Sequence, residues 1–519
     1  MLPGVAHADL GAYVKARAAA ADGAVDAAAA GYAAALAEAP GDEVVAIRAY
    51  RNALAAGDIA LARRAAAVLV RSGVAPADTA ILEFADAVRT RDRLRADDAL
   101  GRIGSGPLDF LAPVLRAWLA FDRGADPFPI LDNAGESGLS RRYIAEHRAL
   151  LLIASKRLDE GVAALRAAVG ADPGSIDLRW NAATLLAGTG RERIAREVLS
   201  GDDPVITALR GGLRKSRPGA AFGTSRLLTR LAADLSGQET QALSILLARS
   251  ALLLDPGDDR AKLLLAAALA GERAFDRAIL ALDTVRPDSP FHGAALAERV
   301  GFLREQDEPE RALALARGMA MRRGADPRDL QRYADNLSDL GQDAEAARVY
   351  QKALEMAGAS ATWVHHLQLG GALERSGQWE AALPHLRKAV ELAPEQPVAL
   401  NYLGYAQIER GENLNEAVAL LERASRLRPD DPAITDSLGW GYLRSGDVAK
   451  ALPLLERAAQ GQPSSPTINE HLGDAYWKSG RRFEARYAWR AAAVYAEGEQ
   501  KGRLTTKLAD GLAQRTAAN

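Results

Sequence analysis

The sequence has 519 residues, of which 48% are hydrophobic and 25% charged, a balance typical of a folded protein rather than a disordered one. Its 65 basic and 67 acidic residues leave a formal net charge of -2, so no overall field would attract nucleic acid or an anionic membrane. Cysteine is absent, which excludes disulfides and thiolate sites from this sequence, and no apolar run reaches the roughly 18 residues that span a bilayer. Abundant alanine and an aromatic share of 5% favour helices over strands, so the predicted class is all-α.

The first residues are similar to the end of an export signal. Ala6, His7 and Ala8 form an A-x-A cleavage pattern directly before Asp9. The basic and long apolar regions that precede such a site are missing. We interpret residues 1–8 as the remnant of a signal peptide, which predicts export to the periplasm. The alternative is that an alanine-rich helix begins there.

Residues 9–200 are predicted to form a divergent solenoid of helical repeats. The second half of such a helical repeat needs small and aromatic residues at fixed positions. The residues Gly23, Ala28, Tyr32, Ala35 and Pro40 fit that spacing. Residues 201–235 are predicted to form an irregular connection, because glycine and proline gather at residues 201–204 and again at 211–219. Its basic cluster, Arg214, Lys215 and Arg217, is interpreted as part of a solvated loop, with contact to a phosphate or an acidic partner as the alternative.

Residues 236–519 contain a sequence repeat. Gly370, Gly404, Gly439 and Gly473 each follow a leucine and stand 34, 35 and 34 residues apart. A missing side chain at each position would allow a neighbouring helix to approach closely. One complete unit reads Leu438, Gly439, Tyr442, Gly446, Ala451, Leu455, Ala458 and Pro463.

This pattern resembles the tetratricopeptide repeat (TPR) signature, which has a period of 34 residues. The best-matched repeats occupy residues 361–497. The resemblance implies a superhelical solenoid of antiparallel helical hairpins, which is the predicted fold. TPR proteins hold other proteins or peptides, so we expect a non-catalytic scaffold or adaptor.

Motifs of catalysis and cofactor binding are not found in the sequence. We find no phosphate loop, H-E-x-x-H zinc motif or nucleophile elbow, and therefore predict no catalytic, cofactor or metal site. His365, His366 and His385 do not follow a metal-ligand spacing, because adjacent histidines point to different faces of a helix.

The resemblance also implies a binding surface, because the first helix of each TPR hairpin lines the concave side of the superhelix. Counting from the matched leucines gives the predicted partner-binding residues Asn401, Tyr405, Asp436, Trp440, Glu470, Asp474 and Trp477. The carboxylates predict a neutral or basic ligand, and the aromatic rings predict apolar side chains on it. The alternative is that Trp440 and Trp477 pack against a neighbouring helix or a terminal cap.

The segments 399–405, 430–440 and 471–477 resemble a group of bacterial envelope TPR proteins. Some of those relatives are lipoproteins that bring a carboxy-terminal processing protease to its substrates. The resemblance implies a periplasmic adaptor with such a protease and its substrates as partners, although this sequence lacks the cysteine that would carry the lipid. A cytoplasmic regulatory or assembly module is the alternative, and self-association stays open.

Overall fold

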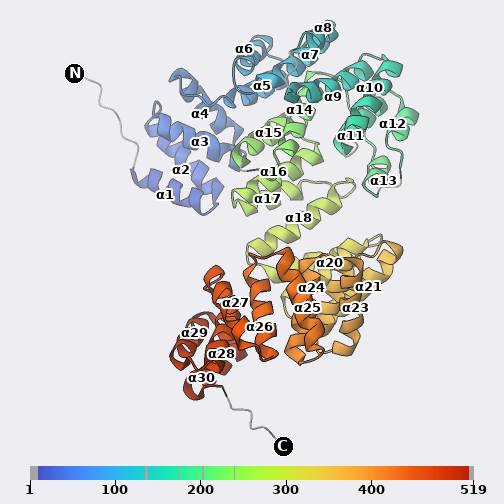
Figure 1. Cartoon of the computed structure of the whole chain (residues 1–519). Helices are drawn as coiled ribbons and strands as arrows, with labels where there is room; N and C mark the ends of the chain where they lie inside the picture. The colour runs from blue at the N-terminus through green and yellow to red at the C-terminus, as the bar shows by residue number, and fades with distance from the viewer. Residues whose placement is uncertain (1–9, 135–137, 173–174, 202–203, 239, 513–519) are drawn as a thin grey trace, which may run out of the picture. The chain divides into compact units, whose positions relative to one another are not determined.

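The computed structural model describes residues 10–134, 138–172, 175–201, 204–238 and 240–512. These residues form thirty α-helices and two short 3-10 helices, with no strand among them (Figure 1). The predicted all-α class is therefore confirmed. The expected signal remnant at residues 1–8 lies outside the described residues.

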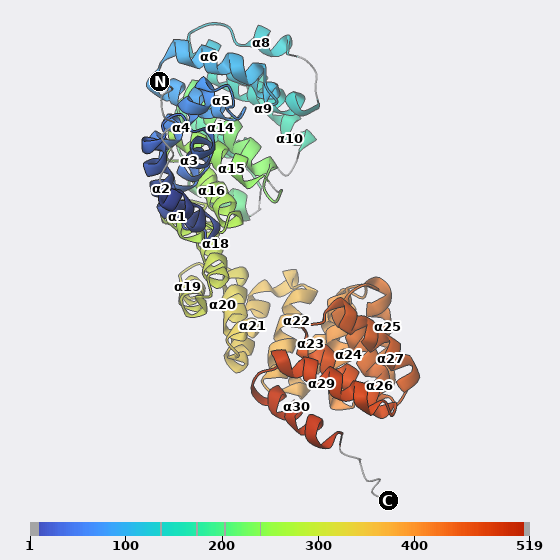
Figure 2. The same ribbon diagram turned by 90° about the vertical axis from the view of Figure 1, so that its left-hand side faces the viewer.

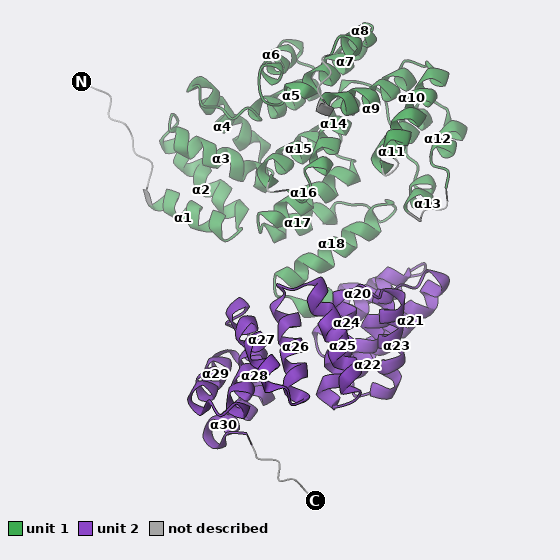
Figure 3. Cartoon of the chain, viewed as in Figure 1, with its two compact units in different colours: residues 1–312 green, residues 313–519 purple. Residues whose placement is uncertain are grey.

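The chain divides into two compact units, residues 1–312 and residues 313–519, and the division falls within α19 (Pro309–Met321) (Figure 3). This division differs from the connection expected at 201–235. That segment holds α13 (Pro204–Gly211) and α14 (Ala220–Asp234). It is largely helical because α14 is a core element, with Leu227 and Leu228 fully buried.

The first unit is built from antiparallel helical hairpins, and its later helices pack against its earlier ones. Its helices are α1 (Leu10–Ala21), α2 (Val25–Glu38), α3 (Glu43–Ala56), α4 (Ile59–Arg71), α5 (Thr79–Thr90), α6 (Arg93–Gly104), α7 (Ala112–Asp122), α8 (Phe128–Asp132), α9 (Gly138–Ala154), α10 (Leu158–Ala171), α11 (Ile176–Gly188), α12 (Glu192–Val198), α13, α14, α15 (Gln241–Leu254), α16 (Asp259–Gly271), α17 (Phe275–Asp283) and α18 (His292–Glu305). Helix α15 packs on α3 and α5, and α14 packs on α7 (Figure 1). The unit is thus closed by contacts between helices far apart in the sequence.

A buried aromatic cluster marks the contact between α7 and α14. Trp118 is fully buried, and Gly223 lies against its indole ring, where a Cβ would come within 2.1 Å. The indole Nε1 donates to His147 Nδ1 at 2.9 Å. Burial lowers the pKa of His147 to about 3, so its ring is neutral and can accept this hydrogen bond.

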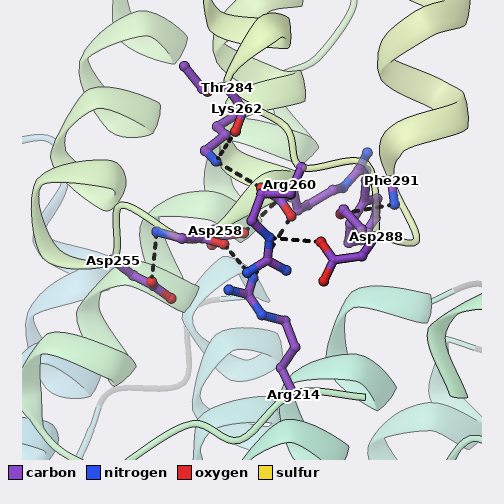
Figure 4. A network of polar contacts seen from close by, with 12 residues as sticks. Arg214, Asp255, Asp258, Arg260, Lys262, Thr284, Asp288 and Phe291 are labelled. Atoms are coloured by element: carbon purple, nitrogen blue, oxygen red, sulfur yellow. Dashed lines mark hydrogen bonds and ion pairs between the residues drawn. The ribbon is translucent and has the colours of Figure 1, made fainter. Parts of the chain in front are cut away.

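A polar network surrounds the loop between α15 and α16, and Figure 4 shows Arg214 reaching toward Asp255 and Asp258 of that loop. Arg226 forms ion pairs with Asp255 at 2.6 Å and with Asp258. Arg214 donates to the Gly257 carbonyl oxygen at 2.8 Å, and Lys215 pairs with Glu192 at 2.8 Å. Two members of the expected solvated basic cluster therefore have partners within the unit.

The second unit is a run of helical hairpins closed by one further helix. Its hairpins are α20 (Pro327–Asp339) with α21 (Asp343–Ala357), α22 (Trp363–Arg375) with α23 (Trp379–Leu392), α24 (Pro397–Arg410) with α25 (Leu414–Leu427), α26 (Pro432–Arg444) with α27 (Val448–Gly461), and α28 (Pro466–Lys478) with α29 (Arg482–Tyr495). Helix α30 (Gly498–Asp510) follows and packs on α29 (Figure 2). Two 3-10 helices, Asp109–Leu111 and Gly358–Ser360, complete the described elements.

The repeating glycines set the packing within these hairpins. A Cβ on Gly370, Gly404, Gly439 or Gly473 would lie 2.7 Å from Leu386, 2.9 Å from Leu421, 2.8 Å from Leu455 and 2.3 Å from Trp489, respectively. Such distances are shorter than van der Waals contact, so each first helix touches its second helix through the bare glycine backbone. The glycines between the two helices, such as Gly446 at φ +90° and Gly480 at φ +85°, adopt the left-handed conformation that reverses the chain.

The contact at Gly473 predicts a large effect of one methyl group. Gly473→Ala should lower the free energy of unfolding of the second unit by about 1–3 kcal/mol, because the added Cβ must displace the fully buried Trp489. Gly502→Ala in α30 is the matched control, since its Cβ would meet no atom within 4 Å and alanine favours helix by up to about 1 kcal/mol. Urea unfolding followed by circular dichroism measures both. Equal midpoints for the two variants would contradict the packing role of Gly473.

Candidate functional site

A groove of about 450 Å³ runs along the first helices of the second unit. It is lined by residues of α22, α24 and α26 and by residues at the start of α28. Three of the predicted partner-binding residues, Asn401, Tyr405 and Asp436, line this groove. The other lining residues are Glu374, Arg375, Tyr402, Ala406, Glu409, Ala433, Ser437, Gln462, Ser465, Thr467 and Ile468.

Local sequence rules place these side chains on one face. Pro397 occupies the first turn of α24, where its missing N–H is not needed. Asn401, Tyr405 and Glu409 then follow at intervals of four residues, so they lie along one side of that helix. At the start of α26, Asp431 accepts from Ala433 N at 3.0 Å and from Ile434 N at 3.2 Å, which fixes where that helix begins.

Asn401 is the lining residue whose side-chain oxygen is unpaired. Its Oδ1 is buried and has no hydrogen-bond partner in the described part of the chain. An unpaired buried acceptor costs about 1–3 kcal/mol, so a ligand N–H that reaches this oxygen gains that energy. The groove can therefore accept a hydrogen bond from the main chain or a side-chain donor of a bound molecule.

The polar side chains around Asn401 are held by one another. Arg375 donates to Asp343 at 2.9 Å and to the Tyr402 hydroxyl at 3.3 Å, while Arg410 pairs with Glu374 at 3.0 Å. Burial and the nearby carboxylates of Glu409 and Asp436 raise the pKa of Tyr405, so its hydroxyl stays protonated. Three carboxylates and one guanidinium group line the groove, which gives it an acidic character.

Trp440 and Asp436 meet at a buried histidine. The indole ring of Trp440 stacks on His471 with centroids 4.0 Å apart and planes at 10°, and its Nε1 donates to Glu409. His471 Nδ1 lies 2.9 Å from Asp436 Oδ2. Burial alone would lower the pKa of His471, but the carboxylates of Asp436, Asp474 and Glu409 together outweigh it, and the pKa is raised. The Asp436 carboxylate is therefore paired with the His471 ring. Trp440 is half-buried beside the groove.

The remaining three predicted residues lie under α30. Lys507 Nζ is 2.8 Å from both the Glu470 and the Asp474 carboxylates. Trp489 Nε1 also donates to Asp474, at 2.9 Å. Gly511 lies so close to the Trp477 ring that a Cβ there would come within 1.9 Å of it. Glu470, Asp474 and Trp477 therefore contact the terminal helix and are not among the groove-lining residues, and their role in binding stays a prediction.

The repeat positions in the sequence predicted three of the groove-lining residues and not the others. Glu374, Arg375, Tyr402 and Glu409 line the groove but were not predicted. Glu409 could have been found by continuing the four-residue interval from Asn401 and Tyr405. Arg375 has no such signal, since its position depends on Asp343 and Tyr402 from two neighbouring hairpins.

The described residues form neither a metal cluster nor a membrane-spanning helix. Within the described ranges, no three His, Asp or Glu side chains gather in a way that could hold a metal ion. His366 Nδ1 instead lies 3.1 Å from His385 Nδ1, while His365 turns back to Thr362. No helix formed by the described residues is long and apolar enough to cross a membrane.

Part of the chain matches a known family of repeats. Residues 237–494 match the tetratricopeptide repeat family. A TPR protein from Thermus thermophilus is 22% identical, with 35% of this chain and 99% of that chain covered and a TM-score of 0.32. PilF from Pseudomonas aeruginosa is 20% identical, with 36% and 85% covered and a TM-score of 0.30. Among proteins with curated descriptions, none matches the chain.

The ion pairs of Lys507 predict that its ammonium group holds α30 against the last hairpin. Lys507→Met should lower the free energy of unfolding of the last hairpin by about 3 kcal/mol, because it leaves the buried Glu470 and Asp474 carboxylates without their ammonium partner. Lys501→Met, an exposed position in the same helix, should change stability by less than about 0.5 kcal/mol. Hydrogen exchange of α30 and urea unfolding report the difference. Unchanged protection of α30 in Lys507→Met would show that the ion pairs do not hold this helix.

Proposed function

Because residues 237–494 match the tetratricopeptide repeat family, we propose that this chain is a non-catalytic scaffold that holds a segment of a partner protein in the groove along α22, α24, α26 and α28. The observation that carries the proposal is the groove itself, in which Asn401, Tyr405 and Asp436 of two successive first helices lie together and Asn401 keeps an unpaired side-chain acceptor. An extended peptide has main-chain N–H groups that need such acceptors.

The chemistry of the lining indicates the kind of segment that fits. Glu409 has no cationic partner in the described ranges, whereas Glu374 is paired with Arg410 and Asp436 with His471. The three carboxylates together favour a neutral or basic segment through Glu409 above all, and the rings of Tyr402 and Tyr405 favour apolar side chains on it. A volume of about 450 Å³ suits a few residues rather than a whole helix. The same carboxylates disfavour a partner that presents a carboxylate tail.

We place this scaffold in the bacterial envelope, where it would deliver substrates to a carboxy-terminal processing protease. Two sequence features support this part of the proposal. They are the A-x-A pattern at residues 6–8 and the resemblance of 399–405, 430–440 and 471–477 to envelope TPR proteins. The partner is then an exported protein whose chain offers a short basic or neutral segment.

Two matched double variants test the groove. Asn401→Ala with Tyr405→Ala removes the open acceptor and one lining ring. Asn415→Ala with Tyr487→Ala removes the same residue types from exposed positions on α25 and α29. Proteins retained from an envelope fraction by the unchanged chain are identified by mass spectrometry. Peptides that tile the retained protein are then titrated by calorimetry.

We expect the groove variant to bind its peptide at least about tenfold more weakly, a loss of about 1.4 kcal/mol, and the control to bind as the unchanged chain does. Equal affinities for the two variants would contradict the groove. A retained set made of cytoplasmic proteins would contradict the envelope location and leave the groove to be judged by the titration alone.

A further inference from the structure

The first unit has a groove of opposite charge on α4. Its volume is about 810 Å³, and it lies along α4 and reaches α5 and the start of α6. Arg63, Arg64, Arg71 and Arg95 line it together with one carboxylate, Glu83. The remaining lining residues are alanine, valine and leucine. We propose that this groove binds an acidic amphipathic helix of a partner protein.

The charges of the groove are not balanced within the chain. Arg63 and Arg95 lie 3.2 Å and 3.1 Å from Asp86, a buried carboxylate that also pairs with Arg89 at 2.7 Å. One carboxylate cannot neutralise three guanidinium groups. Glu83 is already paired with Arg102. The groove thus keeps a local positive excess in a chain whose formal net charge is -2.

Arg64 and Arg71 are the lining residues whose charges attract an acidic partner most strongly. Both are exposed, and neither has an ion pair with any described residue. They stand seven residues apart on α4, so they lie two turns apart on one side of the helix, about 10 Å along its axis. Carboxylates seven residues apart on a partner helix have the same spacing and could meet both guanidinium groups.

The apolar part of the groove fits a helix better than an extended chain. Ala60, Ala67 and Val70 are exposed on α4 at intervals of seven and three residues, which places them in one stripe beside the arginines. Alanines in this stripe let a second helix axis approach closely, and Val70 is 40% exposed, which leaves apolar surface to cover. An amphipathic helix supplies both an apolar stripe and flanking charges.

Other occupants fit these observations less well. Bases of single-stranded nucleic acid stack on aromatic side chains, and no aromatic residue lines the groove. A flat lipid surface does not enter a concavity. A second copy of the chain packed through the same face would place Arg63, Arg64 and Arg71 against identical arginines, which repel.

The test uses the full chain and a designed probe. The probe is a fluorescein-labelled helical peptide of about 14 residues, with leucines along one face and glutamates seven residues apart beside them. A scrambled peptide of the same composition keeps the charge and loses the amphipathic pattern. A single-stranded DNA of equal net charge is the third ligand. Anisotropy is measured at about 50 mM and about 300 mM salt.

Three variants make the result specific. Arg64→Glu with Arg71→Glu reverses the two unpaired charges. Arg328→Glu with Arg457→Glu makes the same change of net charge at exposed arginines of the second unit. Ala67→Trp fills the groove and leaves its charge unchanged. Circular dichroism and urea unfolding check that each variant is folded.

We expect the unchanged chain and the Arg328/Arg457 control to bind the helical probe at least about tenfold more tightly than the scrambled peptide, with the preference lost in the other two variants. Equal binding of the two peptides would overturn the proposal, since charge alone would explain it. Undiminished binding by the Arg64/Arg71 variant or by Ala67→Trp would overturn the location. Tighter binding of the DNA than of the helical probe would assign the groove to nucleic acid instead.

Discussion

The bare glycine on the first helix of each hairpin is the contact on which the second unit depends. At Gly370, Gly404, Gly439 and Gly473 the backbone touches a leucine or tryptophan of the second helix, and a single methyl group would overlap it. Because this contact recurs every 34 or 35 residues, the same close approach of the first helix to the second recurs in successive hairpins. The side chains four positions apart on α24 therefore face those of α26 across one groove. Helix packing thus brings groove-lining residues that are distant in the sequence to one surface.

Charge is segregated in this chain although its total is close to zero. The groove of the second unit is acidic, and the α4 groove of the first unit is basic. Other carboxylates are paired with cations of the same chain and are not available to a ligand. Glu470 and Asp474 are paired in this way with Lys507. Local pairing, and not net charge, decides which charged groups a ligand can meet. The formal value of -2 excludes a bulk electrostatic role and says nothing of these two surfaces.

The sequence predicts the second unit far better than the first. Glycine spacing identified the hairpins, and helical periodicity from matched leucines found Asn401, Tyr405 and Asp436 in the groove. The same count could not show that α30 covers Trp477, because that helix carries no repeat signature. In the first unit, Arg249 donates to the Leu54 carbonyl oxygen at 2.9 Å across 195 residues. Contacts of that kind leave no local pattern, so neither the extent of the unit nor the α4 groove could be read from spacing.

Site-directed photo-crosslinking tests most directly whether the first helices hold the partner. A photoreactive residue is introduced at Ala433, which is exposed in the groove on α26, or at Ala449, which is exposed on the second helix of the same hairpin. We expect illumination to join the partner to position 433 and to leave position 449 unlinked. Crosslinking at 449 with none at 433 would contradict it and move the binding surface to the second helices.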